Sequence, residues 1–142
     1  MTIQELQEQI IDQFKTSDNW IDIDNYLIKL GKSLPPVDLK YKTEYNLIKG
    51  CQVKTWFHST LKNGKVFYDI DSSSIIIKGV IALLIKVLSG HKPEDIKSVD
   101  LYFIDKMGLK EYFSPVRANS LWKLINRMKS AAAFYETNIV NK

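Results

Sequence analysis

Cysteine is nearly absent from this 142-residue chain, in which Cys51 is the only one. A single cysteine excludes an internal disulfide and a thiolate-rich metal site. The two histidines, His58 and His91, lie far apart in the sequence, so we expect no cluster of metal ligands. These absences predict a cytoplasmic, reduced protein that holds neither a metal ion nor another cofactor.

The chain also lacks a long apolar run and a block of like charge. Its most apolar stretch, residues 79–85, is far too short to span a bilayer, and its acidic, polar beginning does not read as a signal peptide. The net charge is +4, but the lysines are spread singly along the chain. We therefore predict no membrane or nucleic-acid partner, and a basic surface that is either simply solvated or docks an acidic partner.

What is present fits one globular domain over residues 1–142. The composition is 45% hydrophobic and 25% charged, close to the norm for globular proteins. A chain of this length buries roughly two-thirds of the surface that its unfolded form exposes, so no disulfide or metal is needed for folding.

Apolar residues at helical spacing predict two helices at the beginning of the chain. Thr2 and Glu5 form a capping box for the first. The segment 17–19 separates the two helices and caps the second. Gly31 is predicted to be the residue just after the end of the second helix.

From Val53 the apolar period changes to two, which indicates strands. Asn63-Gly64 is a strong signal for a two-residue hairpin turn, because a type I′ turn needs positive φ at both positions. Counting back from this turn predicts the pair Lys62/Lys65 next to the turn. It then places Leu61/Val66, Ser59/Tyr68 and Phe57/Ile70 on one mainly apolar face, with Thr60/Phe67, His58/Asp69 and Trp56/Asp71 on the other face.

Helical signals return after the hairpin. They predict a buried central helix over Ser74–Ser89, a short helix from Pro93, one or two short helices within 101–113, and a last long helix from Ser114-Pro115 that frays after Thr137. The order of helices, hairpin and helices predicts an α+β fold, in which a small antiparallel sheet is covered on one face by helices.

The residues alone leave the role of Cys51 open. If the strand extended that far, Cys51 would share the apolar face with Val53 and Phe57, as a small buried hydrophobe does. Gly50 and the polar stretch before it instead place the thiol at a boundary between loop and strand, where functional groups are commonly displayed. A cysteine-dependent hydrolase is a weaker alternative, because nothing in the sequence places a histidine beside Cys51.

Four segments of the chain, in order, carry a resemblance to a known family. They are "NWIDIDNYLIKLGKSLPP" (19–36), "GCQVKTW" (50–56), "DSSSIIIKGVIALLIKVLSG" (71–90) and "FSPVRANSL" (113–121). Together they resemble the SufE family, the sulfur acceptors that act with cysteine desulfurases. The family is similar in fold to the IscU-type cluster scaffolds, but those use several cysteines, so a scaffold role is nearly excluded here.

The resemblance implies a function for the thiol. Cys51, as a thiolate, takes sulfur from the persulfide of a SufS-like, pyridoxal-phosphate-dependent desulfurase and passes it to an iron–sulfur scaffold complex. It implies a sulfur carrier and desulfurase activator rather than a metal-dependent enzyme. We expect the thiol to be largely buried in the free protein, which would protect it from oxidation. The alternatives are an interaction module with a structural cysteine, or a sister-family acceptor for a different desulfurase system.

Other residues join Cys51 as binding candidates through the same resemblance. Gly50 and Gln52 flank the thiol, and Arg117 and Asn119 begin the last helix. Asp71 either caps the central helix or holds the Cys51 loop, and Arg117 either forms a surface salt bridge or acts near the thiol or partner. The pair His58/Asp69 is interpreted as a surface cross-strand pair rather than a catalytic dyad.

Overall fold

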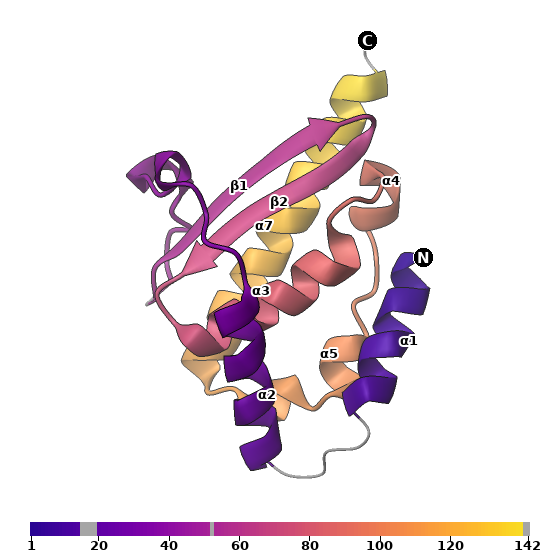
Figure 1. Ribbon diagram of the computed structural model, residues 1–142. Helices are drawn as coiled ribbons and strands as arrows, with labels where there is room; N and C mark the ends of the chain where they lie inside the picture. The colour runs from indigo at the N-terminus through magenta and orange to yellow at the C-terminus, as the bar shows by residue number, and fades with distance from the viewer. Residues whose placement is uncertain (15–19, 52, 141–142) are drawn as a thin grey trace.

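The computed structural model describes residues 1–14, 20–51 and 53–140, and for residues 20–22, 139 and 140 it describes the backbone only. The elements follow one another as α1 (Ile3–Phe14), α2 (Trp20–Ser33), the short 3₁₀ helices η1 (Leu39–Tyr41) and η2 (Glu44–Asn46), β1 (Thr55–Lys62), β2 (Lys65–Ser72), α3 (Ile75–Leu88), α4 (Pro93–Ile96), α5 (Phe103–Lys106), α6 (Leu109–Tyr112) and α7 (Pro115–Val140). This is the predicted α+β architecture, with one two-stranded antiparallel sheet and helices against it (Figure 1).

The hairpin has the predicted turn and the predicted register. Asn63 and Gly64 have φ values of 53° and 76°, as a type I′ turn requires. All seven expected pairs are present, from Trp56 opposite Asp71 to Lys62 opposite Lys65. A two-residue turn sets the register of both strands, so the pairing follows from the local sequence.

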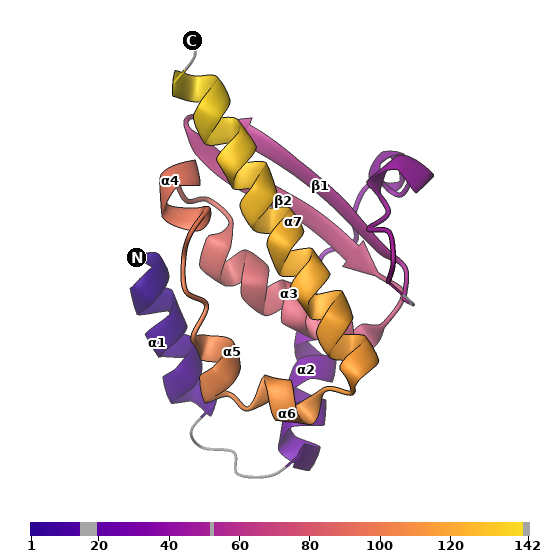
Figure 2. The same ribbon diagram turned by 180° about the vertical axis from the view of Figure 1, so that it is seen from behind.

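Helices α3 and α7 cover one face of the hairpin. Figure 2, which views the molecule from behind, shows α7 in front of both strands, with α3 beside it. The buried side chains of the sheet face these helices, and the hydroxyl of Tyr68 donates a 2.8 Å hydrogen bond to the carbonyl oxygen of Met128 on α7. The core residues of these four elements are Phe57, Val66, Tyr68, Ile70, Ile76, Ile77, Val80, Ile81, Leu83, Leu84, Val87, Leu88, Leu121, Leu124, Ile125, Met128, Ala131 and Ala132.

Helix ends lie close to where the sequence places them. The Thr2/Glu5 capping box is formed, with both hydrogen bonds at 3.0 Å. Ser74 caps α3 by accepting from the amide of Ile77, and Ser114 caps α7 by accepting from the amide of Arg117. Helix α7 extends to Val140, and the fraying expected after Thr137 stays a prediction. The expected cap at residues 17–19 lies outside the described residues.

Gly31 does not end α2, so the sequence prediction is wrong at this position. The helix continues to Ser33, and Gly31 lies where α2 crosses α3. A Cβ on Gly31 would overlap the carbonyl oxygen of Ile75, and one on Gly79 would overlap that of Leu27. Gly31 is therefore needed because two helix backbones come close together. In the sequence, a glycine of this kind looks the same as one that ends a helix.

Candidate functional site at the Cys51 loop

Cys51 lies in a loop rather than on a strand. The strand β1 begins four residues later, at Thr55, so the alternation that assigned Cys51 to the apolar face does not reach it. The residue is half-buried, and the expectation of a largely buried thiol stays a prediction. The thiol is thus displayed at a loop-to-strand boundary, the second of the two sequence interpretations. Gln52 lies outside the described residues.

Helix α7 holds the Cys51 loop through Lys123. The ammonium group of Lys123 donates to the carbonyl oxygen of Gly50 at 3.1 Å and lies 3.5 Å from that of Lys49. Gly50 has a φ of 83°, a left-handed conformation that glycine adopts without strain. A Cβ at Gly50 would also collide with the Lys123 ammonium group. Glycine is therefore favoured here by the left-handed backbone conformation, because the flexible end of the Lys123 side chain could move away from a Cβ.

The start of α3 holds the other side of the loop. The amide of Lys54 donates to the hydroxyl of Ser73 at 3.1 Å, and the amide of Ser73 donates to the carbonyl oxygen of Lys54 at 2.9 Å. Before the loop, the amide of Ile48 donates to the carbonyl oxygen of Thr55 at 2.9 Å. The segment that carries Cys51 is thus tied to β1, to the start of α3 and to α7.

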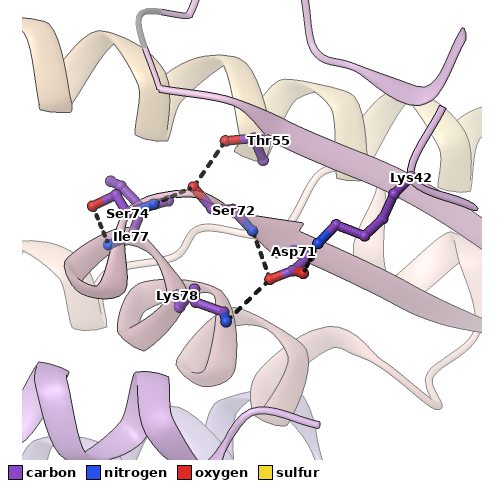
Figure 3. Close-up of polar contacts among 7 residues, drawn as sticks. All are labelled: Lys42, Thr55, Asp71, Ser72, Ser74, Ile77 and Lys78. Atoms are coloured by element: carbon purple, nitrogen blue, oxygen red, sulfur yellow. Dashed lines mark hydrogen bonds and ion pairs between the residues drawn. The ribbon is translucent and has the colours of Figure 1, made fainter. Parts of the chain in front are cut away.

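Asp71 is buried at the end of β2 and binds two lysines (Figure 3). Its carboxylate lies 3.0 Å from the ammonium nitrogen of Lys42 and 3.4 Å from that of Lys78. It also accepts a 2.8 Å hydrogen bond from the amide of Ser72. Ser74, not Asp71, caps α3, so the cap interpretation of Asp71 is wrong. Asp71 instead fastens the segment that leads toward Cys51, because Lys42 belongs to that segment.

The charges around Asp71 favour its ionised form. Burial raises the pKa of Asp71. The hydrogen bonds from Lys42 and from the amide of Ser72, together with the nearby charge of Lys78, lower the pKa by more than burial raises it, so the pKa lies below its ordinary value. The ammonium group of Lys42 also lies over the Trp56 ring, 4.7 Å from its centre. Asp71 is therefore an anionic anchor between the hairpin, α3 and the segment before the loop.

The two candidates at the start of α7 are exposed. Within the described part of the chain, the side chain of Arg117 makes no hydrogen bond or ion pair, so the surface salt bridge that its sequence position suggested is not formed there. Asn119 lies one helical turn before Lys123 and shares its face of α7. Arg117 lies about 120° away from Lys123 around the helix axis. Of these two residues, Asn119 is the one that lies on the loop-facing side.

Neither histidine is placed for a cysteine–histidine dyad. His58 stacks on Tyr41 with ring centres 3.7 Å apart, and its Nδ1 lies 3.6 Å from the Asp69 carboxylate, as a cross-strand pair. His91 pairs with Val66 near the hairpin turn, at the other end of the strands from the loop before β1. Over residues 1–14, 20–51 and 53–140, no three His, Cys, Asp or Glu side chains gather as a possible metal site.

Sequence reasoning missed Lys42, Lys78 and Lys123 as parts of this site. Each is a single lysine among many. The partners of Lys42 and Lys123 lie far away in the sequence, whereas Lys78 lies on the helix that follows Asp71. The one available signal for Lys78 was its place before Gly79 in the third of the four family-like segments. Nothing in the sequence distinguishes Lys123 from Lys129, the other lysine of α7.

Replacing Lys123 with Met should loosen the Cys51 loop. Met keeps the apolar stem but cannot donate to the carbonyl oxygens of Lys49 and Gly50. A net hydrogen bond contributes about 0.5–1.5 kcal/mol, so we expect the amide of Ile48 to exchange its hydrogen about 2–10 times faster.

Hydrogen exchange followed by NMR measures this effect for each amide. The matched control is Lys129→Met, a change on the same helix that leaves the loop contacts intact. Equal exchange rates for Ile48 in Lys123→Met and the unaltered protein would show that Lys123 does not hold the loop.

A family comparison covers most of the chain. The model of a family described as "SufE: Fe-S metabolism associated domain" matches residues 8–132. This range includes the Cys51 loop, both strands and most of α7. In the described residues, no helix has the length and apolar character needed to cross a membrane.

Individual proteins show the same likeness. An uncharacterised SufE-like protein of Rhizobium meliloti is 35% identical over 130 residues, covering 88% of this chain and 93% of that protein. The "cysteine desulfuration protein SufE" of Wigglesworthia glossinidia brevipalpis is 33% identical over 125 residues, 86% of each chain. A SufE-like protein of Arabidopsis thaliana, named as chloroplastic/mitochondrial, is 34% identical over 111 residues, covering 78% of this chain and 30% of that protein.

A solved structure supports the fold. The solution structure of a hypothetical protein from Thermus thermophilus matches with a TM-score of 0.75, covering 93% of this chain and 96% of that one. Its sequence identity of 23% makes it a likeness of fold alone.

Proposed function

This chain belongs to the SufE family, and on that premise we propose that Cys51 accepts sulfur from a cysteine desulfurase and carries it to iron–sulfur cluster assembly. The observation that carries the proposal is the position of the chain's only thiol. Cys51 is partly exposed on a loop held by α3 and α7, where a partner's sulfur atom can reach it. The protein acts as a stoichiometric carrier, and the pyridoxal phosphate belongs to the partner.

The transfer is a thiol exchange without net oxidation. The thiolate of Cys51 attacks the outer sulfur of the desulfurase persulfide and forms a new sulfur–sulfur bond. The sulfur–sulfur bond of the desulfurase breaks, and its cysteine leaves as a thiolate. Cys51 then holds the terminal sulfur as a persulfide, which a second thiolate on the downstream cluster scaffold takes in the same way.

The desulfurase docks on the surface around Cys51. This surface combines the Cys51 loop with the segment 71–74 and with Arg117 and Asn119. Apolar side chains are exposed nearby at the starts of α3 and α7, with Ile75 38% and Val116 44% exposed. A cation and an amide beside exposed apolar groups are typical of a protein-binding surface.

Mass spectrometry of the intact chain tests the proposal. The chain is incubated with a SufS-like desulfurase and free cysteine, without added reductant. We expect a gain of the mass of one sulfur atom, reversed by dithiothreitol and assigned to Cys51 in the peptide digest. Arg117→Ala should slow the gain by about 2–10-fold, because the variant loses a positive charge on the docking surface. A chain that gains no sulfur from this desulfurase or from one of another system would be an interaction module with a structural cysteine.

The same chemistry favours a reducing compartment. A lone, partly exposed thiol that must alternate between thiolate and persulfide is consumed by oxidation outside such a compartment. We accordingly place the protein in the cytoplasm, where fractionation with an antibody to the chain would locate it. Recovery in an organelle fraction would contradict this placement.

A further inference from the structure

Three lysines lie side by side across the turn end of the hairpin. Lys62 pairs with Lys65 across β1 and β2. Val66 pairs with His91 on the other edge of β2, in antiparallel orientation, so Lys65 also lies beside Lys92. Like charges at directly opposite positions of a sheet repel and lower stability. The repulsion within this row lowers the stability of the hairpin, and no ion pair inside the hairpin, all of whose residues the structure describes, offsets it.

The row borders a hollow in the surface. Lys65 and Lys92 line a depression of about 550 Å³ together with Lys86, from the last turn of α3. We call Lys62, Lys65, Lys86 and Lys92 the lysine patch. All four are exposed, and none forms an ion pair within the described residues. The hollow holds one carboxylate, Asp95, against three of these ammonium groups.

We propose that the lysine patch binds an acidic segment of a partner protein. Carboxylates on one face of a helix lie about 5–6 Å apart, close to the roughly 4.8 Å between neighbouring strands that separates the lysines of the row. Phe67, 39% exposed on the same face of the hairpin, offers an apolar contact beside the charges. Charge complementarity thus selects a short acidic peptide segment that also carries apolar side chains.

The boundaries of the lysine patch favour a short ligand over a nucleic acid. Duplex DNA carries a negative charge about every 1.7 Å of its axis and would extend beyond four lysines. It would then meet Glu94 and Asp95, both exposed at the start of α4, and Asp69, which is 51% exposed on β2. These carboxylates would repel a long phosphate backbone, whereas a short acidic segment fits between them.

The lysine patch is separate from the Cys51 loop. Figure 1 shows the turn between β1 and β2 at the opposite end of the hairpin from the loop that precedes β1. Eight residues of strand span about 26 Å, so one short segment does not reach both places. An acidic partner segment can therefore remain bound while Cys51 meets a different surface. Binding at the lysine patch does not depend on sulfur transfer by Cys51.

Binding of a fluorescently labelled, Glu-rich helical peptide tests the proposal by anisotropy. The triple variant Lys62→Gln, Lys65→Gln, Lys92→Gln should bind about tenfold more weakly, as the loss of three exposed charge pairs predicts. The matched control is the triple variant Lys29→Gln, Lys32→Gln, Lys106→Gln, which removes the same charge from exposed positions elsewhere. It should bind within about twofold of the unaltered protein.

Three results would overturn the proposal. One is equal weakening in both triple variants, which would indicate attraction to net charge only. Another is no binding of the Glu-rich peptide by the unaltered protein at about 0.15 M salt, where weak surface attraction is screened. The third is tighter binding of a duplex DNA of similar charge. Sulfur acceptance by Cys51 in the patch variant is measured alongside, so that failure of the lysine patch is distinguished from failure of the proposed function.

Discussion

Replacing Cys51 with Ser is expected to abolish sulfur acceptance completely. A serine hydroxyl is not ionised at neutral pH and forms no persulfide, and the chain has no other cysteine to take over. Incubation with a desulfurase and cysteine should therefore add no sulfur to the variant. Stimulation of desulfurase turnover, measured without reductant as the alanine left when sulfur is removed from cysteine, should fall to the level of the desulfurase alone.

The fold should survive this change. Cys51 is partly exposed on a loop, so the free energy of unfolding should change by less than about 1 kcal/mol, as measured in urea. Cys51→Ala serves as a matched variant that also removes hydrogen bonding at this position. Either variant that stays folded and still stimulates the desulfurase would disprove the relay, because stimulation would then not pass through the thiol.

Replacing Asp71 with Asn should cause a clear loss of stability. Asn retains an oxygen that can accept from the amide of Ser72, but it loses the negative charge between Lys42 and Lys78. Leaving two ammonium groups without a counter-charge at a buried carboxylate position should lower the unfolding free energy by about 1–3 kcal/mol. This expected loss of unfolding free energy is smaller than that for breaking a fully buried ion pair, because the side chains of Lys42 and Lys78 are 29% and 28% exposed.

The effect of Asp71 depends on pH in a defined direction. Its pKa in the folded protein is lower than its ordinary value, so folding favours the ionised form. The stabilisation is complete above the ordinary pKa of about 3.9 and is lost as the pH falls through the lower, folded-state pKa. The free energy of unfolding, measured in urea between about pH 6 and pH 2, should therefore differ less between Asp71→Asn and the unaltered protein as the pH falls.

Asp69→Asn is the matched control for this experiment. It makes the same chemical change two residues away on β2, at a carboxylate that is 51% exposed. An exposed pair contributes at most about 1 kcal/mol, so the control should change stability little. If both variants lost the same free energy, or if the gap for Asp71→Asn stayed constant in acid, the anchor role of Asp71 would be refuted.

Short-range rules in the sequence determined much of this fold. The Asn63-Gly64 turn needs positive φ at both residues, and a two-residue turn leaves one register, so every cross-strand pair followed by counting. The caps at Thr2 and Ser114 followed in the same way, because a capping side chain bonds to an amide only a few residues ahead, whereas the sequence left several cap candidates for α3 between Asp71 and Ser74. The sequence also singled out Cys51, as the only thiol and within a family-like motif.

Tertiary structure alone decided the contacts between distant segments. It placed Lys42 beside Asp71 and Lys123 over Gly50, and it made Gly31 a point of helix contact instead of a helix end. It also placed the thiol on a partly exposed loop, because β1 begins only at Thr55. A capping hydrogen bond forms within one turn of the chain, so the local sequence predicts it. An ion pair between residues far apart in the sequence forms only after the helices have packed. The periodicity of apolar residues does not indicate which lysine will then contact which oxygen.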